Sequence, residues 1–543
     1  MKLIFFWFFI FAKAISAQSP TVLQWVQNFG SGNYDHVSGI YWDNECYLYV
    51  SGYFSGNLNG QTSNGGTDAY LAKYDNNGSL IWLRIFGGTE EDRVHQLSYD
   101  NAAGRILLSG YFMGKMYYGN DSLSTIDRED IFVISIDTAG NYQWGRSFGG
   151  PGSQSSSSIA VDKEHNISLS GYFEDTLQAD GIQLVSRGLR NAFLLQLDSS
   201  GTCSWGYRMG GLLYDEGLNI THDVQNNLYL SGYYRDTADF GPFAARSVFT
   251  YDCFLVSLSQ SGNWRWLRSF GGGYIDNCPA IAYMPKSGNV LVGGWFFNDI
   301  SFGADTMLIA AGEEESFLAA FDTLGQLKWS RRFGDVFAEL LYDLSVDSED
   351  NILAVGTFDS IIQIGQDTFI AKHYNKPTDL FVFGFTPEGK YSWGYKAGAE
   401  FNDFGFQCAW GDSSTFYISG NFLNKSIFSS DTIFSNGNYD VYLAKLFLDT
   451  AGIRPNAIAP LIESDFLLRV FPNPADDFIN IEFDELPAYG YDLQLFDIYG
   501  RMLLQKNISE KIAVLNLREL EKGHYFMRIA NGGRVQVVGV VKR

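Results

Sequence analysis

The chain has 543 residues and a formal net charge of -23. This excess of acid lacks the clustered lysine and arginine on which nucleic-acid binding depends, so no nucleic-acid partner is expected. Its five cysteines (Cys46, Cys203, Cys253, Cys278 and Cys408) have no paired short spacing, which argues against a zinc motif or a dense disulfide framework.

The first seventeen residues are typical of an export signal. Lys2 supplies a positive end, residues 3–11 form a short apolar run, and residues 14–17 make a small-residue cleavage site. We expect residues 1–17 to be a signal peptide that is cleaved between Ala17 and Gln18. Later apolar runs are too short to span a bilayer, so the mature form is expected to have no transmembrane segment.

One sequence pattern recurs seven times over residues 18–449, with a period of roughly sixty residues that is typical of a propeller or array. A tryptophan stands four residues before Phe-Gly or a close variant at Trp25, Trp82, Trp144, Trp205, Trp266, Trp329 and Trp393. Each period also contains a Gly-aromatic-aromatic segment or a weaker copy. A polar residue, usually acidic, then precedes a β-rich run.

Alternating apolar and aromatic residues between Gly, Asn and Asp turns predict four short antiparallel strands per period. The fold class predicted for residues 18–449 is therefore all-β, a seven-bladed β-propeller of four-stranded antiparallel blades. The last period lacks its own Trp strand. We expect the N-terminal strand, residues 22–29, to close the last blade beside residues 439–446, which removes an exposed edge.

The repeat also resembles a known family. The Trp-x3-Phe-Gly-Gly, Gly-Tyr-Phe and Asp-x-Phe-Leu-x-x-Leu-Asp-x-x-Gly elements are similar to those of the seven-bladed beta-propeller repeat family of bacterial secreted proteins, over about residues 21–447. The resemblance implies the propeller fold and extracellular use. It carries over no common catalytic residues.

A second unit is expected after a linker at residues 450–465. Short alternating strands over residues 466–543 predict a small β-sandwich. Its Phe-Pro-Asn-Pro start (Pro472, Asn473, Pro474), its hairpin at Gly500 and its ending after Gly523 resemble the type A C-terminal sorting domain of the type IX secretion system in Bacteroidota. An ordinary immunoglobulin-like module is the alternative.

The sorting-domain resemblance implies a route and a partner for the whole protein. The signal peptide would deliver the chain to the periplasm, and the type IX secretion machinery would then carry it through the outer membrane. The expected location is extracellular or on the outer-membrane surface. The propeller would then carry the protein's activity.

An acidic residue recurs at the predicted start of the innermost strands: Asp35, Asp92, Asp215, Asp276, Glu339 and Asp403, with Gln154 in the remaining blade. Such a ring could bind calcium or a basic group at the channel, and calcium is the one possible cofactor. The favoured alternative is that each carboxylate accepts backbone N–H groups of its own Gly-rich loop, because a residue present in every blade serves what every blade needs.

The residues directly after the ring differ between blades and include His36, Arg93 and Glu216. Together with the ring acids Asp35, Asp92, Asp215, Asp276, Glu339 and Asp403, they are the candidate ligand-binding residues at the channel mouth. His36 with Glu216 or Asp215 could act as an acid–base pair, although the spacing does not show that they converge. The longer loops share this face, which favours it for recognition.

Three functional hypotheses follow. The leading one is a non-enzymatic binding, adhesion or scaffold module that recognises protein or glycan at the cell surface. The second is a glycan-active hydrolase or lyase at the channel mouth, and the third is a structural surface-layer protein. The sequence has no Gly-x-Ser-x-Gly elbow, no His-x-x-x-His spacing and no phosphate-binding glycine loop, so no catalytic residue is assigned.

Overall fold

The computed structural model describes residues 21–43, 45–303, 306–335, 337–365, 367–371, 378–412, 414–449, 468–471, 475–483, 491–497, 502–518, 520–531 and 534–543. The chain divides into two units, Met1–Gly452 and Ile453–Arg543. The predicted signal peptide with Ala17 and Gln18, the linker, and Pro472, Asn473, Pro474 and Gly500 of the sorting motif lie outside the described residues.

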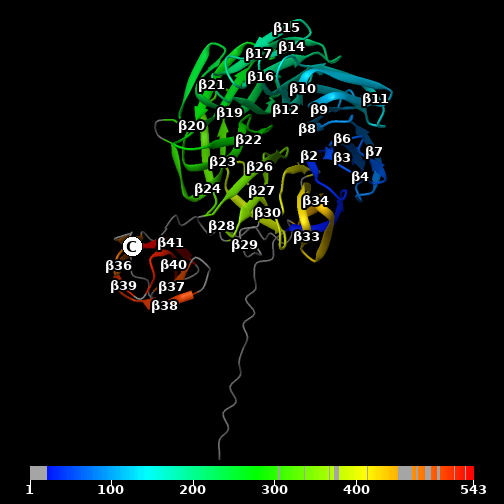
Figure 1. Ribbon diagram of the computed structural model, residues 1–543. Helices are drawn as coiled ribbons and strands as arrows, with labels where there is room; N and C mark the ends of the chain where they lie inside the picture. Colours follow the sequence, from blue (N-terminus) through cyan, green and yellow to red (C-terminus); the bar gives the residue numbers. More distant parts are fainter. Residues whose placement is uncertain are drawn as a thin grey trace, which may run out of the picture. The chain divides into compact units, whose positions relative to one another are not determined.

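Five four-stranded antiparallel sheets and one eight-stranded sheet, with three small hairpins, make up the described part of the first unit (Figure 1). The eight-stranded sheet consists of two four-stranded groups joined by a short pairing of Met209–Gly211 with Ala238–Phe240. The seven four-stranded groups are here called blades 1 to 7. Blade 1 consists of β2 (Asp35–Trp42), β3 (Leu48–Phe54), β6 (Asp68–Tyr74) and β7 (Leu80–Phe86), and blade 2 of β8 (Asp92–Asp100), β9 (Arg105–Tyr118), β10 (Asp121–Asp137) and β11 (Tyr142–Phe148). Blade 3 consists of β12 (Gln154–Val161), β13 (Ile167–Phe173), β16 (Asn191–Leu197) and β17 (Cys203–Gly211), and blade 4 of β18 (Glu216–His222), β19 (Leu228–Phe240), β20 (Phe243–Leu258) and β21 (Trp264–Phe270).

The other three blades follow the same order. Blade 5 consists of β22 (Asp276–Tyr283), β23 (Val290–Ser301), β24 (Met307–Phe321) and β25 (Leu327–Phe333). Blade 6 consists of β26 (Glu339–Val346), β27 (Ile352–Asp359), β30 (Thr378–Phe385) and β31 (Tyr391–Ala397). Blade 7 consists of β32 (Gln407–Trp410), β33 (Thr415–Phe428), β34 (Asp431–Leu448) and β1 (Thr21–Phe29). Three small hairpins extend the second-to-third-strand loops: β4 (Asn57–Leu58) with β5 (Gln61–Thr62), β14 (Thr176–Ala179) with β15 (Ile182–Val185), and β28 (Ile361–Ile364) with β29 (Asp367–Ile370).

The blades close into a ring. The innermost strands β2, β8, β12, β18, β22, β26 and β32 contact one another in cyclic order, and β32 contacts β2. Strand β1 pairs antiparallel with β34, with Val26 opposite Ala444 and Phe29 opposite Val441. The prediction that the N-terminal strand completes the last blade is therefore confirmed.

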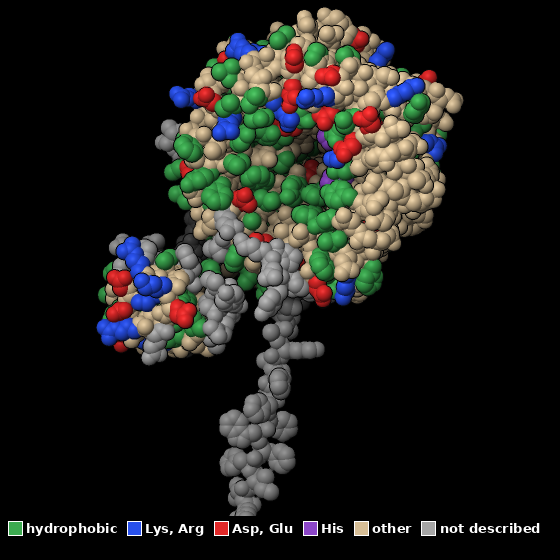
Figure 2. All heavy atoms as spheres, in the orientation of Figure 1, with side chains coloured by type: hydrophobic (Ala, Val, Ile, Leu, Met, Phe, Trp, Pro, Cys, Tyr) green, Lys and Arg blue, Asp and Glu red, His purple; other side chains and the backbone are tan. Residues whose placement is uncertain are grey.

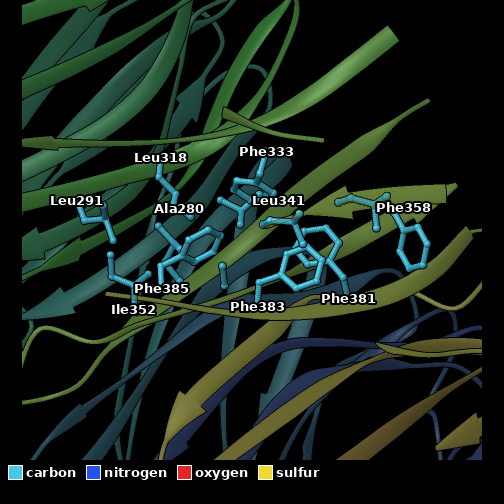
Figure 3. Close-up of a cluster of buried hydrophobic side chains, with 14 of the residues drawn as sticks. Ala280, Leu291, Leu318, Phe333, Leu341, Ile352, Phe358, Phe381, Phe383 and Phe385 are labelled. Atoms are coloured by element: carbon cyan, nitrogen blue, oxygen red, sulfur yellow. The ribbon is translucent and has the colours of Figure 1, made fainter. Parts of the chain in front are cut away.

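Apolar side chains fill the space between neighbouring blades. In the cluster between blades 5 and 6, Leu318 and Leu341 are fully buried together with Phe381 and Phe383 (Figure 3). The Phe333 ring packs edge-on against Phe381 at 5.9 Å between centroids. Because burial contributes about 25 cal/mol per Å² of apolar surface, these interfaces are the main source of cohesion between the sheets.

The repeated tryptophans take part in the same packing. Each lies on the outermost strand of one blade, and several cover the tight third-to-fourth-strand turn of the next. A Cβ added at Gly201 would lie 2.8 Å from Trp144, and one at Gly325 would lie 2.7 Å from Trp266. Trp266 Nε1 also donates to the Thr323 carbonyl at 2.9 Å. The tryptophan repeat therefore joins successive blades.

The second unit is a small β-sandwich. One sheet contains β35 (Leu468–Phe471), β36 (Phe478–Phe483) and β39 (Ile512–Asn516). The other contains β38 (Met502–Ile508), β37 (Tyr491–Asp497), β40 (Gly523–Asn531) and β41 (Arg534–Lys542). Ile481, Leu493 and Met527 are buried in its core. Gly523 of the sorting motif begins β40. No helix long and apolar enough to cross a membrane occurs in the described chain.

Candidate functional site

The acidic residues at the starts of the innermost strands are buried in the junctions between blades. The side chains of the six acids Asp35, Asp92, Asp215, Asp276, Glu339 and Asp403 are at most 1% exposed. Each accepts the backbone N–H of the residue four positions earlier, as in Ser31 to Asp35 at 2.6 Å and Gly88 to Asp92 at 2.6 Å. Gln154 accepts the N–H of Gly150 in the same way, at 3.1 Å.

The remaining acids repeat this hydrogen bond. The backbone N–H of Gly211 donates to Asp215 at 2.7 Å, and that of Gly272 donates to Asp276 at 2.8 Å. In the same way Asp335 N–H donates to Glu339 at 3.0 Å, and Ala399 N–H donates to Asp403 at 2.9 Å. These are the bonds expected if each ring side chain accepts backbone N–H groups of its own loop. Among the described residues, no three His, Cys, Asp or Glu side chains converge as a metal site.

A second acidic residue, on the third strand of the preceding blade, interacts with the ring acid in five junctions. The pairs are Asp440 with Asp35, Asp68 with Asp92, Asp252 with Asp276, Glu315 with Glu339, and Asp379 with Asp403. In the other two junctions one acid is replaced by an amide: Gln154 follows Asp130, and Asn191 precedes Asp215. We call these seven sets the junction pairs.

The Asn191 junction shows what the third-strand position requires. Asn191 Oδ1 accepts the N–H of Arg187 at 2.9 Å, which fixes the orientation of the amide. Asn191 Nδ2 then donates to the Gly211 carbonyl at 2.8 Å and to Asp215 Oδ2 at 3.1 Å. This atom therefore occupies a position that calls for a donor, facing an acceptor carboxylate.

Burial raises the pKa of the ring acids. Desolvation is the main cause, and the facing carboxyl adds to it, so that the pKa reaches about 7 for Asp92, about 8 for Asp403 and about 9 for Asp276. One proton held between two facing carboxyls supplies the donor that the Asn191 amide supplies in its own junction. The pairs of Asp276 and Asp403 thus hold this proton at neutral pH.

In most blades the first strand bulges just beyond the residue that follows the ring acid. In blades 1, 2, 3, 4 and 6 one extra residue interrupts the pairing with the second strand: Ser38, His95, Ser157, Leu218 and Tyr342. A bulge of this kind aims side chains differently from a regular strand. Just before it, the residue after the ring acid pairs directly with an aromatic residue, as His36 does with Tyr53 and Glu216 with Tyr233.

A cavity of about 280 Å³ lies at this level. It is lined by His36, Val37, Ser38, His95, Ser157, Glu216, Tyr342, Phe406 and Gln407, which come from blades 1, 2, 3, 4, 6 and 7. Figure 2 looks into the hollow at the centre of the ring, where histidine, acidic and apolar side chains are visible together. We call this space the channel-mouth cavity.

Glu216 is the one carboxylate of the cavity lining. Ser157 Oγ donates to Glu216 Oε1 at 2.7 Å, and the Tyr233 hydroxyl donates to Oε2 at 2.7 Å. In the part of the chain that the structure describes, it forms no ion pair within 4.0 Å. The carboxylate is thus oriented by two hydroxyl groups while its charge is left without a close counter-ion.

The two histidines of the cavity are neutral at physiological pH. Burial lowers the pKa of His36 to about 3, with His95 and Arg93 adding to the shift, and burial lowers that of His95 to about 4. His95 Nδ1 is 3.1 Å from the Ser156 carbonyl, which marks it as the protonated nitrogen. The His95 Nε2 atom is then an acceptor.

The structure brings together His36 and Glu216 among the sequence-predicted residues. Arg93 does not line the cavity; it lies over the Tyr53 ring at 4.7 Å and is paired with Glu91 at 2.8 Å. The six ring acids do not line the cavity. Sequence reasoning missed His95, Ser157, Tyr342 and Phe406, although their place two residues beyond the variable position was visible as strand alternation.

Comparison with known proteins identifies the second unit. Residues 469–543 match the family described as Secretion system C-terminal sorting domain. This match confirms the sorting-domain resemblance. It means that the chain engages a secretion machinery and is exported to the cell surface or the extracellular space.

The propeller has more distant likenesses. A 199-residue stretch, 35% of this chain, is 24% identical to an uncharacterized WD repeat-containing protein of Acanthamoeba polyphaga mimivirus and spans only 11% of that protein. Among solved structures, PorZ of Porphyromonas gingivalis is 11% identical with a TM-score of 0.30, covering 95% of this chain and 75% of that one. Sqt1 of Chaetomium thermophilum is 9% identical with a TM-score of 0.34, covering 77% and 99%. Likenesses this weak carry no argument about function.

Proposed function

We propose that this exported protein is a binding module that recognises a glycan or protein ligand at the channel-mouth cavity of its propeller. The observation that carries the proposal is a difference between neighbouring positions at the start of the first strands. The ring acid is buried and bonded to its own loop, whereas the next residues vary from blade to blade and line a cavity. Varied polar and aromatic groups in a preformed cavity are typical of a ligand site.

The protonation states favour binding over the hydrolase or lyase hypothesis. A general acid must be protonated at the working pH, and the neutral imidazoles of His36 and His95 cannot donate in that way. Both Glu216 oxygens already accept hydroxyl hydrogens from Ser157 and Tyr233. This arrangement holds the carboxylate as a fixed acceptor, which suits recognition.

The test is a screen of the purified full-length protein against glycan and surface-protein arrays. We expect a ligand whose affinity falls at least tenfold in a His36→Ala, Glu216→Ala double variant, because both side chains line the cavity. Gln225→Ala, an exposed first-to-second-strand turn residue of blade 4, is the control and should bind normally. A ligand bound equally by the double variant would contradict the proposal, and so would rapid turnover of a polymer.

A further inference from the structure

We propose that the channel-mouth cavity takes an ammonium group, presented by a lysine side chain or by an amino sugar. The inference rests on the proposed function and names the chemistry of its ligand. It is carried by three features of the cavity lining: an oriented carboxylate, the absence of lysine and arginine from the lining, and aromatic rings beside it.

The charges of the lining favour a cation. Glu216 is its one charged group, since His36 and His95 are held neutral by burial. Its oxygens are already bonded by Ser157 and Tyr233, so the carboxylate is preoriented, and carboxylate oxygens accept more than one hydrogen bond. An ammonium group supplies both a counter-charge and donors to this acceptor.

The neutral groups of the lining are also suited to a donor-rich ligand. His95 Nε2 is an acceptor because Nδ1 faces a carbonyl. Arg93 acts electrostatically on the two histidines and Arg190 on Glu216, but Arg93 is paired with Glu91 at 2.8 Å and Arg190 with Glu174 at 3.3 Å.

Aromatic rings form the opposite wall. Phe406 lies 5.0 Å from the His36 ring, 5.1 Å from Tyr342 and 5.3 Å from the parallel Phe404 ring, all measured between centroids. Phe406 and Tyr342 both line the cavity. The face of an aromatic ring attracts an ammonium group, and the attraction grows when water is excluded.

The size of the cavity limits the ligand. At about 280 Å³ it lies just below the roughly 300–1,000 Å³ of sites for drug-sized molecules. It admits one aliphatic side chain or one sugar ring. The rest of a larger ligand would lie on the loop-rich face, where Tyr34 and Tyr274 are exposed.

Calorimetric titration of the full-length protein tests the inference with four small probes. They are Nα-acetyl-lysine amide, its neutral counterpart Nα-acetyl-norleucine amide, glucosamine, and N-acetylglucosamine. We expect at least one ammonium probe to bind at least tenfold more tightly than its neutral counterpart. The lysine and glucosamine arms distinguish a protein ligand from a glycan ligand.

Two variants locate the site. Glu216→Gln keeps the shape of the side chain and removes its charge, so it should lower the affinity for the ammonium probe at least tenfold. Glu164→Gln, on the opposite face of the propeller, should leave this affinity unchanged. Unchanged melting temperatures show that both variants fold. Equal binding of charged and neutral probes, no binding of either ammonium probe, or a Glu216→Gln variant that binds normally would each overturn the inference. An array ligand that still needs the cavity would then leave the proposed function standing.

Discussion

Replacing Gly110 by alanine is expected to destabilise the propeller by about 3 kcal/mol or more. Gly110 lies on β9 opposite Val94, beside the bulge of β8. A Cβ at this position would lie 1.8 Å from the Arg93 carbonyl oxygen, which is backbone and cannot turn away. The two strands would have to move apart, which would break the hydrogen bonds between them.

The same contact recurs in every blade. The glycine of each Gly-aromatic-aromatic segment or weaker copy would place a Cβ 1.8 to 2.2 Å from the carbonyl oxygen of the variable channel residue, at Gly52, Gly110, Gly171, Gly232, Gly294, Gly356 and Gly420. Glycine is therefore required by close backbone approach beside the bulge, not by a turn. The bulge and the aim of the channel residues depend on it.

Thermal and urea unfolding of Gly110→Ala measure the effect. Gly32→Ala is the matched control, because no atom lies within 4 Å of its added Cβ and its φ is not in the left-handed region. We expect Gly32→Ala to unfold as the wild type does. A Gly110→Ala variant within about 1 kcal/mol of wild type would show that the strands separate at little cost and that the glycine serves another purpose.

The fold was largely predictable from the sequence, because its signals are local and repeated. Seven Trp strands predicted seven blades, and because the last period lacks its own Trp strand, the N-terminal strand β1 was expected to pair with β34, as it does. The bulges were not predictable. A single extra residue, such as His95 or Tyr342, reverses strand alternation beyond it, and no side-chain pattern marks where this happens.

The site was predictable in part for the same reason. His36 and Glu216 were selected because they vary between blades, and both line the cavity. Phe406 enters the cavity from blade 7 at the same spacing, three residues after its ring acid, although it precedes β32. The sequence repeat aligns the ring acids with one another and the third-strand acids with one another, but it does not show that the two sets meet. That required the three-dimensional structure, most clearly for Asp35, which faces Asp440 from the other end of the ring.

The junction pairs make the propeller sensitive to alkali. Asp276 is 1% exposed and faces Asp252 and Asp299, and burial raises its pKa to about 9. Between the unfolded pKa near 4 and this folded value, the folded state holds the extra proton, so stability falls as the pH rises. Below this range both states are protonated; above it the loss is complete.

Asp276→Asn should therefore flatten the pH dependence of stability. The amide supplies permanently the donor that the protonated carboxyl supplies only at low pH, as the Gln154 amide donates to the Pro151 and Glu174 carbonyls at its own junction. We expect the variant to match the wild type near pH 5 and to exceed it near pH 9, with a slope difference of at most about 1.4 kcal/mol per pH unit. Thermal unfolding at intervals of one pH unit, in buffer with EDTA, measures this.

Asp137→Asn provides the control, because the pKa of Asp137 is lowered by the backbone N–H groups of its exposed turn despite partial desolvation, and it should leave the alkaline slope unchanged. Calcium offers a competing account of the same paired carboxyls. If a metal ion rather than a proton joined them, stability would rise with pH when calcium replaces EDTA, and Asp276→Asn would lose that gain. If stability falls as the pH rises and calcium does not reverse the fall, the junction pairs hold protons and not a metal ion. Glu216 in the channel-mouth cavity is then the carboxylate that remains available to bind a cation.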